Sequence, residues 1–218
     1  MKIRTLGLLP ESALQATSPV DHPEWNYRPL LGIVQRLRFH IALNLLGMDR
    51  FGRILEIGYG SGVFMPELTK RCDELYGVDP HPHTAEVASN LARHGITASL
   101  SKHSVESLPY PTGHFDCVVT VSSLEYVPDI DAACQEVRRV LVPGGTFVVV
   151  TPGATPLWDL ALRLGTGESP SQYADRRQKL RPALHRHFRP VRDVGIPPFG
   201  GRFLRLYTGL RLRSTRSR

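Results

Sequence analysis

Short apolar runs alternate with helical patterns along the chain from about residue 50 onward. Five of these runs are predicted strands: Arg53–Ile57, Leu75–Val78, Ala98–Leu100, Phe115–Val121 and Thr146–Thr151. Apolar residues at helical spacing predict helices between them, over Ser61–Arg71, Thr84–His94 and Asp129–Leu141. This alternation is the signature of stacked βαβ units around a parallel sheet.

The two ends of the chain follow different patterns. Leu30–Leu46 has apolar residues at helical spacing and predicts an N-terminal helix or a pair of helices. Residues 152–185 are interpreted as an insertion, because a stretch rich in Pro, Gly and Thr precedes the charged, helical segment Tyr173–Leu184. Beyond it, Pro190–Val194 and Arg202–Thr208 are expected to supply the last two strands.

Size and composition indicate one globular domain, since the chain has 218 residues, of which 41% are hydrophobic and 22% charged. No apolar run approaches the roughly 20 residues that span a bilayer, because Arg36 and Arg38 interrupt the N-terminal apolar stretch. Residues Met1–Pro10 lack the long apolar core and cleavage site of a signal peptide. We therefore expect a cytoplasmic protein.

The cysteines support the same view. There are three, Cys72, Cys117 and Cys134, without a CxxC pair or a Cys/His cluster, so we expect neither disulfides nor a metal site. Cys117 lies in an apolar run and is expected to be a buried, unreactive thiol.

Charge is distributed unevenly along the chain. Residues 1–175 carry 14 Lys/Arg against 19 Asp/Glu, whereas residues 176–218 carry 13 Lys/Arg against Asp193 alone, a net charge of +12. Such a basic segment fits an anionic partner, and a charged, solvated surface is the alternative. No RNA-binding module is recognisable in it, so weak contact with an anionic membrane surface is favoured over nucleic acid.

A glycine-rich turn follows the first predicted strand. It lets a ligand approach the backbone closely, because glycine has no side chain and tolerates positive φ. A dinucleotide fingerprint that begins at Gly58 and Gly60 requires glycine at position 63, where the chain has Val63; the third glycine is Gly62. The turn, with Glu56 before it, instead resembles the E/D-x-G-x-G-x-G motif of class I S-adenosylmethionine (SAM)-dependent methyltransferases.

The resemblance implies roles for residues of this turn and of the next strand end. Glu56 would accept a hydrogen bond from the SAM ammonium, and the turn from Gly58 to Gly62, with Tyr59, would surround the methionine part of the cofactor. Asp79 ends the second predicted strand, 23 residues after Glu56, and would bind the ribose hydroxyls, with Pro80 beside it. The alternative for Asp79 is an aspartate that only opens the following proline-rich turn.

A further block, Ser104–Tyr110 followed by Phe115-Asp116, resembles the family's D-A-E-x-L-P-F…F-D pattern. In the family its first residue binds the adenine amino group, and the following backbone N–H meets the ring. These positions are Ser104 and Val105 here, and a serine hydroxyl offers a weaker acceptor than the usual carboxylate.

Two later blocks complete the resemblance. Residues 122–129, from Ser122 on, resemble S-x-L-E-H-V-P-D, with Tyr126 where many relatives have His. Residues 140–149 match V-L-x-P-G-G-x-l-v-v, a structural hallmark of the family. Strand ends carry the ligands of open α/β sheets, so Ser122 is expected at the cofactor.

The resemblance is closest to the broad family that includes the ubiquinone and menaquinone biosynthesis methyltransferases. It implies an α/β, Rossmann-like, doubly wound sheet of seven mostly parallel strands, with an antiparallel last strand and helices on both faces. We divide the chain into an N-terminal helical lid, residues 1–50, and a methyltransferase domain, residues 51–218. The implied reaction transfers a methyl group from SAM to a small-molecule or lipid-like acceptor.

Acceptor contacts are expected from Tyr27 and Arg28 on the lid, Tyr126 after the fourth strand, and Trp158 in the insertion. Catalytic residues stay unassigned, because alignment and water exclusion supply much of the rate of methyl transfer. Two other functions are an RNA methyltransferase that uses the basic C-terminal segment and a SAM-binding protein without turnover. The oligomeric state is left open.

Overall fold

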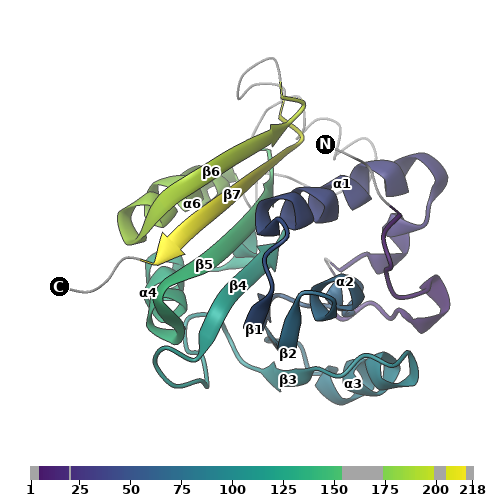
Figure 1. Ribbon diagram of the computed structural model, residues 1–218. Coiled ribbons are helices and arrows are strands. Elements are labelled where there is room, and N and C mark those ends of the chain that lie inside the picture. The colour runs from purple at the N-terminus through teal and green to yellow at the C-terminus, as the bar shows by residue number, and fades with distance from the viewer. Residues whose placement is uncertain (1–4, 20, 154–173, 199–204, 215–218) are drawn as a thin grey trace.

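The chain folds around one seven-stranded sheet with helices on both faces (Figure 1). The computed structural model describes residues 5–19, 21–153, 174–198 and 205–214. The strands are β1 (Phe51–Ile57), β2 (Cys72–Asp79), β3 (Ser99–Lys102), β4 (Phe115–Val121), β5 (Leu141–Pro152), β6 (Phe188–Ile196) and β7 (Tyr207–Ser214). The helices are α1 (Pro29–Leu46), α2 (Met65–Thr69), α3 (Thr84–Arg93), α4 (Ile130–Val140), α6 (Ala174–His187) and the short 3-10 helices η1 (Glu11–Ala13), η2 (Pro23–Asn26) and η3 (Leu124–Tyr126).

The order of strands across the sheet is β3-β2-β1-β4-β5-β7-β6. The strands from β1 to β5 pair in parallel, whereas β7 runs antiparallel between β5 and β6. The predicted α/β class, the seven strands and the antiparallel last strand are confirmed. Strand order reverses between β1 and β4, and ligands of open α/β sheets bind beyond the carboxyl ends of the strands at such a point.

Each face of the sheet carries its own apolar core. Helices α1, α2 and α3 pack on one face, where Ile41, Met65 and Leu91 are buried. Helices α4 and α6 cover the other face with buried residues such as Val137 and Leu184. Because side chains of a parallel strand alternate between two buried faces, its sequence is almost continuously apolar.

Helix α1 brings the N-terminal part of the chain to the sheet and confirms the helix predicted over Leu30–Leu46. Ile41 and Leu45 in its second half pack against Gly209 of β7, where a side chain would collide with both. Its middle turns carry Gln35 and Arg38, which line the cavity described below. The lid role of residues 1–50 stays a prediction.

Several element boundaries differ from the sequence-based expectation; β5, for example, begins at Leu141 rather than at Thr146. The helix predicted over Ser61–Arg71 is reduced to α2, because the chain remains in turns before Met65 and Pro66 occupies the first helical turn, where its missing N–H is tolerated. The last strand is Tyr207–Ser214 rather than Arg202–Thr208, because it pairs along β5 as far as Arg213. Residues 202–204 lie outside the described part.

All three cysteines are buried and unpaired, and burial raises the pKa of Cys72 to about 11, which suits structural thiols. Within the described ranges, no helix is long and apolar enough to cross a membrane. Those ranges also contain no group of three or more His, Cys, Asp or Glu side chains that could hold a metal ion.

Candidate functional site

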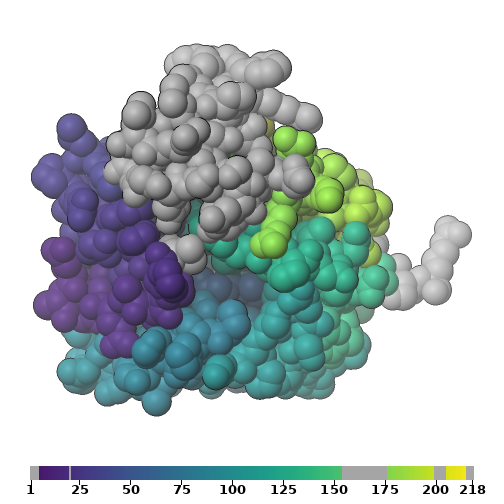
Figure 2. Space-filling model, turned by 180° about the vertical axis from the view of Figure 1, so that it is seen from behind, coloured from purple at the N-terminus to yellow at the C-terminus, as the bar shows by residue number. Residues whose placement is uncertain are grey.

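A cavity of about 620 Å³ lies at the carboxyl ends of β1, β2 and β4. The glycine-rich turn after β1 and the loops after β2, β3 and β4 line it, and the N-terminal segment and α1 contribute the remaining wall. Figure 2 shows this face of the molecule hollowed between the purple N-terminal residues and the blue and teal residues of those loops. Segments far apart in the sequence therefore meet at one site.

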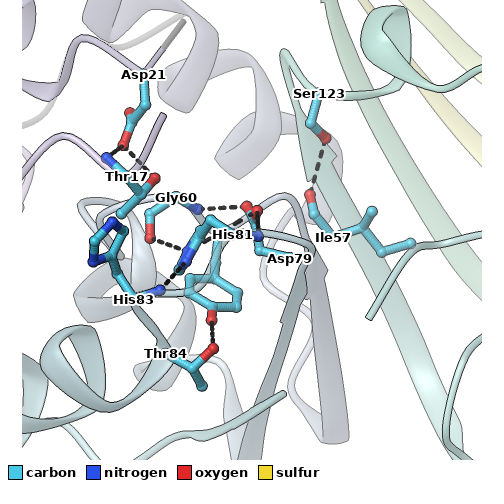
Figure 3. Close-up of polar contacts among 10 residues, drawn as sticks. Thr17, Asp21, Ile57, Gly60, Asp79, His81, His83, Thr84 and Ser123 are labelled. Atoms are coloured by element: carbon cyan, nitrogen blue, oxygen red, sulfur yellow. Dashed lines mark hydrogen bonds and ion pairs between the residues drawn. The ribbon is translucent and has the colours of Figure 1, made fainter. Parts of the chain in front are cut away.

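The glycine-rich turn depends on Gly58 for its shape. Gly58 has a φ of 72°, and an ideal Cβ at this position would lie 2.3 Å from Cβ of Ser123 in the loop after β4. Ser123 is held there because its hydroxyl donates to the Ile57 carbonyl oxygen at 3.0 Å (Figure 3). Both the left-handed backbone and the close approach of the two loops require glycine.

Asp79 and His81 hold the same turn from the end of β2 (Figure 3). The Asp79 carboxylate accepts the Gly60 N–H at 2.9 Å and the His81 N–H at 3.2 Å. The His83 N–H donates to Nδ1 of His81 at 3.1 Å. Nε2 of the neutral ring therefore carries the proton and donates to the Gly60 carbonyl oxygen at 3.1 Å. Sequence reasoning found Asp79 and missed the buried His81.

Glu56 stands at the end of β1 on the cavity wall and is only 4% exposed. Burial, and then the nearby charge of Asp79, raises the pKa of Glu56 to about 8, while Arg38 acts in the opposite direction. Its Oε2 atom has no hydrogen-bond partner among the residues that the structure describes. A buried carboxyl group in this state is stabilised by a cationic partner.

Four buried polar atoms around this cavity lack a hydrogen-bond partner within the described part of the chain. They are Oε2 of Glu56, Nε of Arg38 and the hydroxyl oxygens of Ser61 and Ser122. An unsatisfied buried polar group costs about 1–3 kcal/mol, so native proteins keep few of them. Their concentration on one cavity indicates a polar ligand with both donors and acceptors.

Arg38 reaches the cavity from α1 and was missed by sequence reasoning, which treated it only as a charge within an apolar stretch. Its guanidinium lies over the Phe39 ring, 4.9 Å from the centroid. Its Nη2 contact with Oδ1 of Asn26 is long, at 3.5 Å. Among the described residues, the Arg38 guanidinium therefore makes only a long hydrogen bond to Asn26, and its charge lowers the pKa of the nearby Glu56.

The loop after β3 contributes Ser104, Val105 and Glu106 to the wall. The Ser104 hydroxyl donates to Oε2 of Glu106, and Oε1 of Glu106 accepts the Asp129 N–H at 3.0 Å. A carboxylate thus stands beside the serine that replaces the family's usual acid. Glu106 lies two residues further along the same block, but its sequence position alone does not show that its side chain folds back.

The loop after β4 contributes Ser122 and Tyr126. Ser122 has a φ of 55°, which is uncommon for a residue with a side chain and occurs often at functional sites. Its N–H donates to the Val150 carbonyl oxygen at 2.8 Å, a bond that holds this conformation.

Nine of the ten residues predicted to bind the cofactor line the cavity: Glu56, Gly58, Tyr59, Gly60, Asp79, Pro80, Ser104, Val105 and Ser122. The tenth, Gly62, is not among the lining residues, and its φ of 74° completes the turn instead. The cavity therefore brings together residues from four separate sequence blocks.

The acceptor candidates are divided. Tyr126 lines the cavity, whereas Tyr27 and Arg28 do not. The Tyr27 hydroxyl donates to the Leu9 carbonyl oxygen, and Arg28 is exposed just before α1. Trp158 lies outside the described residues. Of these candidates, Tyr126 alone lines the cavity among the described residues, and its contact with an acceptor stays a prediction.

The N-terminal segment supplies lining residues that no sequence pattern indicated. Thr17, Ser18, Asp21 and His22 stand on the wall beside the glycine-rich turn. This segment has no helical or strand periodicity, so its position depends on tertiary contacts.

Comparison with known proteins shows which family the region around this cavity resembles. A family model described as "Methyltransferase domain" matches residues 55–149, which include the glycine-rich turn, Asp79, the Ser104 loop and η3.

Two curated relatives share this region. A sterol 4-C-methyltransferase of Caenorhabditis elegans is 30% identical over 130 residues, which cover 58% of this chain and 39% of that protein. The ubiquinone/menaquinone biosynthesis C-methyltransferase UbiE of Pseudomonas paraeruginosa is 30% identical over 129 residues, covering 55% of this chain and 49% of that protein. The chain spans about half or less of the length of these relatives.

Among solved structures, the N-methyltransferase NodS from Bradyrhizobium japonicum WM9 in complex with S-adenosyl-L-homocysteine (SAH) matches with a TM-score of 0.63 at 21% identity. The match covers 84% of this chain and 88% of that chain, and it shows a shared Rossmann-like fold. The motifs, the family match over residues 55–149 and the fold together make this chain similar to the class I SAM-dependent methyltransferases, a class whose cofactor is SAM.

Proposed function

We propose that this chain is a methyltransferase that transfers the methyl group of SAM to a small, lipid-like acceptor, at a carbon atom of a quinone- or sterol-like ring. The acceptor class is supported by the similarity of this chain to the sterol and ubiquinone/menaquinone C-methyltransferases. The observation that carries the proposal is the set of buried polar atoms without a partner on one cavity wall, at Arg38, Glu56, Ser61 and Ser122 among the described residues.

These atoms fit the methionine part of SAM, which is a zwitterion. Oε2 of Glu56 would accept a hydrogen bond from the ammonium group, and Nε of Arg38 would donate one to the carboxylate. Burial of an unpaired acid and of a cation with few hydrogen bonds costs free energy. A ligand that carries both opposite charges offsets this cost, because it pairs with each of the two side chains.

The nucleoside part finds its partners further along the wall. Asp79 would accept hydrogen bonds from the ribose hydroxyls at the end of β2. The Ser104–Glu106 pair would accept the adenine amino group, with Glu106 supplying the carboxylate that is missing at the first position of the block, and the Val105 N–H would meet the ring.

When bound, SAM supplies an electrophilic methyl group on a sulfonium. The chain's own contribution is to orient this group and to exclude water, which accounts for much of the rate in such displacements. Phe39, Val121 and Tyr126 add apolar surface to the cavity wall. Tyr126 is the residue through which we expect the acceptor to be contacted.

The test is a transfer assay with methyl-labelled SAM and a panel of a prenylated hydroquinone, a sterol and a simple phenol. Label is expected in a carbon-methylated quinone- or sterol-like product, located by mass spectrometry or NMR. Binding of SAM without transfer to any acceptor would contradict the proposal and favour a SAM-binding protein without turnover. Transfer to RNA would favour the other alternative, which is weakened because most described arginines of the basic segment bind other parts of the chain.

A further inference from the structure

The carboxylate of Asp21 stands directly over the glycine-rich turn. Its Oδ2 accepts the Thr17 N–H at 3.0 Å and the Thr17 hydroxyl at 2.8 Å, so the N-terminal segment holds it in place (Figure 3). An ideal Cβ at Gly60 would lie 3.3 Å from Oδ2 of Asp21 and 3.4 Å from Oδ1. The absence of a side chain at Gly60 therefore leaves room for this carboxylate beside the turn.

Asp21 shares this location with a second acid. Asp79, at the end of β2, accepts the N–H of the same residue, Gly60, at 2.9 Å. Burial raises the pKa of Asp21, the two Thr17 hydrogen bonds and Arg38 lower it, and the charge of Asp79 raises it again. Two carboxylates that flank one residue in a partly buried site attract a cation between them.

The second observation that points to a ligand is Glu56 on the same cavity. Its side chain is more than nine-tenths buried, and its Oε2 has no partner in the described ranges. The cavity beside the glycine-rich turn is thus lined by three acids, Asp21, Glu56 and Asp79. Arg38 is a neighbouring cation on the same wall. Asp21 and Asp79 outnumber Arg38, so the local charge is negative even while Glu56 holds a proton.

The connectivity of SAM places its charges along this turn, an argument that rests on the proposed function. The sulfonium connects the ribose carbon to the methionine chain. If Asp79 binds the ribose and Glu56 the ammonium, the sulfonium lies between them along the turn, beside Gly60 and the Asp21 carboxylate.

We propose that Asp21 is a specificity residue that makes this site prefer SAM over its product SAH. Methyl transfer forms a bond between the acceptor carbon and the methyl carbon, the carbon–sulfur bond breaks with its electron pair left on sulfur, and the acceptor carbon then releases its proton to water. The sulfonium thereby becomes a neutral thioether. The attraction of Asp21 for the sulfur centre ends at that moment, while the contacts of Glu56 and Asp79 remain, so the product is released more readily than the substrate.

The test is isothermal titration of the full chain with SAM and with SAH, as wild type and as Asp21→Asn. The wild type is expected to bind SAM more tightly than SAH. Asp21→Asn keeps an oxygen for Thr17 but loses the charge, so SAM binding should weaken about tenfold while SAH binding changes less than about twofold. Equal weakening of both, or no change in the ratio, would overturn the inference.

Two further variants separate charge from structure. Thr17→Val removes one of the hydrogen bonds that position the Asp21 carboxylate but leaves the charge of Asp21 in place. The ratio of SAM affinity to SAH affinity should therefore stay above that of Asp21→Asn. Asp73→Asn removes an acid that is paired with Arg50 on the surface, and the ratio should equal the wild-type value. If Asp21→Asn still binds SAM and SAH and the ratio of the two affinities is unchanged, only this inference is contradicted. If the wild type binds neither compound, the proposed function is contradicted as well.

Discussion

The cavity at the carboxyl ends of β1, β2 and β4 and the basic C-terminal segment are both rich in polar and charged side chains, but they use them in opposite ways. Around the cavity, Glu56, Arg38, Ser61 and Ser122 each keep a buried polar atom without a partner in the described ranges. In the C-terminal segment, eight of the nine described arginines from Arg176 to Arg213 donate hydrogen bonds within the chain, six of them to residues outside the segment.

The net positive charge of the C-terminal segment therefore overstates how many of its arginines are available to an anionic partner. Arg181 and Arg205 both contact Asp193, and Arg211 joins Asp49 to the end of α1. Arg181 and Arg205 therefore connect parts of the segment to one another, and Arg211 connects β7 to the end of α1. Contact of the segment with an anionic membrane surface stays a prediction, for which the exposed Arg189 is the best-placed residue.

The largest effect is expected from Gly58→Ala, which attacks the turn at the floor of the cavity. The added methyl group would collide with Ser123 and strain a left-handed residue, so SAM binding should fall by about a hundredfold or more, the equivalent of at least about 2.7 kcal/mol. Isothermal titration measures the loss.

Gly95→Ala is the matched control for this substitution. Gly95 has a φ of 73°, close to that of Gly58, but nothing lies within 4 Å of its ideal Cβ. The backbone strain is therefore similar and the collision absent. Equal losses of SAM binding in the two variants would show that the close approach of Gly58 and Ser123 is irrelevant to the site.

The pH dependence of SAM binding tests Glu56. Its pKa of about 8 means that the free protein holds a proton there at neutral pH, because burial and Asp79 disfavour the carboxylate. An ammonium partner favours the carboxylate and lowers this pKa, so binding releases a proton and tightens as pH rises, by up to about tenfold per unit. The window is about pH 6 to 7.5, since an α-amino group itself loses its proton near pH 8.

Glu56→Gln removes this titrating group while it preserves the shape of the side chain. Affinity for SAM should be lower, and its rise between about pH 6 and 7.5 should disappear. A slope that survives in Glu56→Gln would assign the proton to another group and contradict the role of Glu56.

The smallest effect on binding is expected in the C-terminal segment. Arg211→Ala removes hydrogen bonds to the Leu45 carbonyl oxygen and to Asp49, so stability to urea should fall by about 1–2 kcal/mol while the SAM affinity stays within about twofold. Arg189 is exposed and is the second residue of β6. Arg189→Ala should therefore change the free energy of unfolding by less than about 0.5 kcal/mol. A loss of SAM affinity in Arg211→Ala would show that the C-terminal segment and the cavity are not independent of each other.

Sequence patterns predict most of this architecture because strand and helix periods, the glycine register and the strand-end acids are local features. Gly58, Gly60 and Asp79 were found in this way, and they meet at the cavity. The shift of the last strand to Tyr207–Ser214 was not, because its register depends on pairing with the extended β5.

The missed site residues share one property: their positions depend on tertiary structure. Arg38 belongs to a helix whose rotation is set by packing on the sheet, and Asp21 to a segment without any regular period. Glu106 reaches the wall by folding back on Ser104. Tyr27 and Arg28 were placed at the cavity by analogy with a lid, but contacts with Leu9 and exposure at the start of α1 keep them away.

The central claim is that the cavity between the N-terminal segment and the carboxyl ends of the strands binds SAM. Isothermal titration of the wild type and of Asp79→Ala with SAM tests it most directly. We expect micromolar-scale binding to the wild type and at least about tenfold weaker binding to Asp79→Ala, because the ribose loses its acceptor and the turn loses the Gly60 contact. Absence of binding to the wild type, or equal affinity in both proteins, would contradict it.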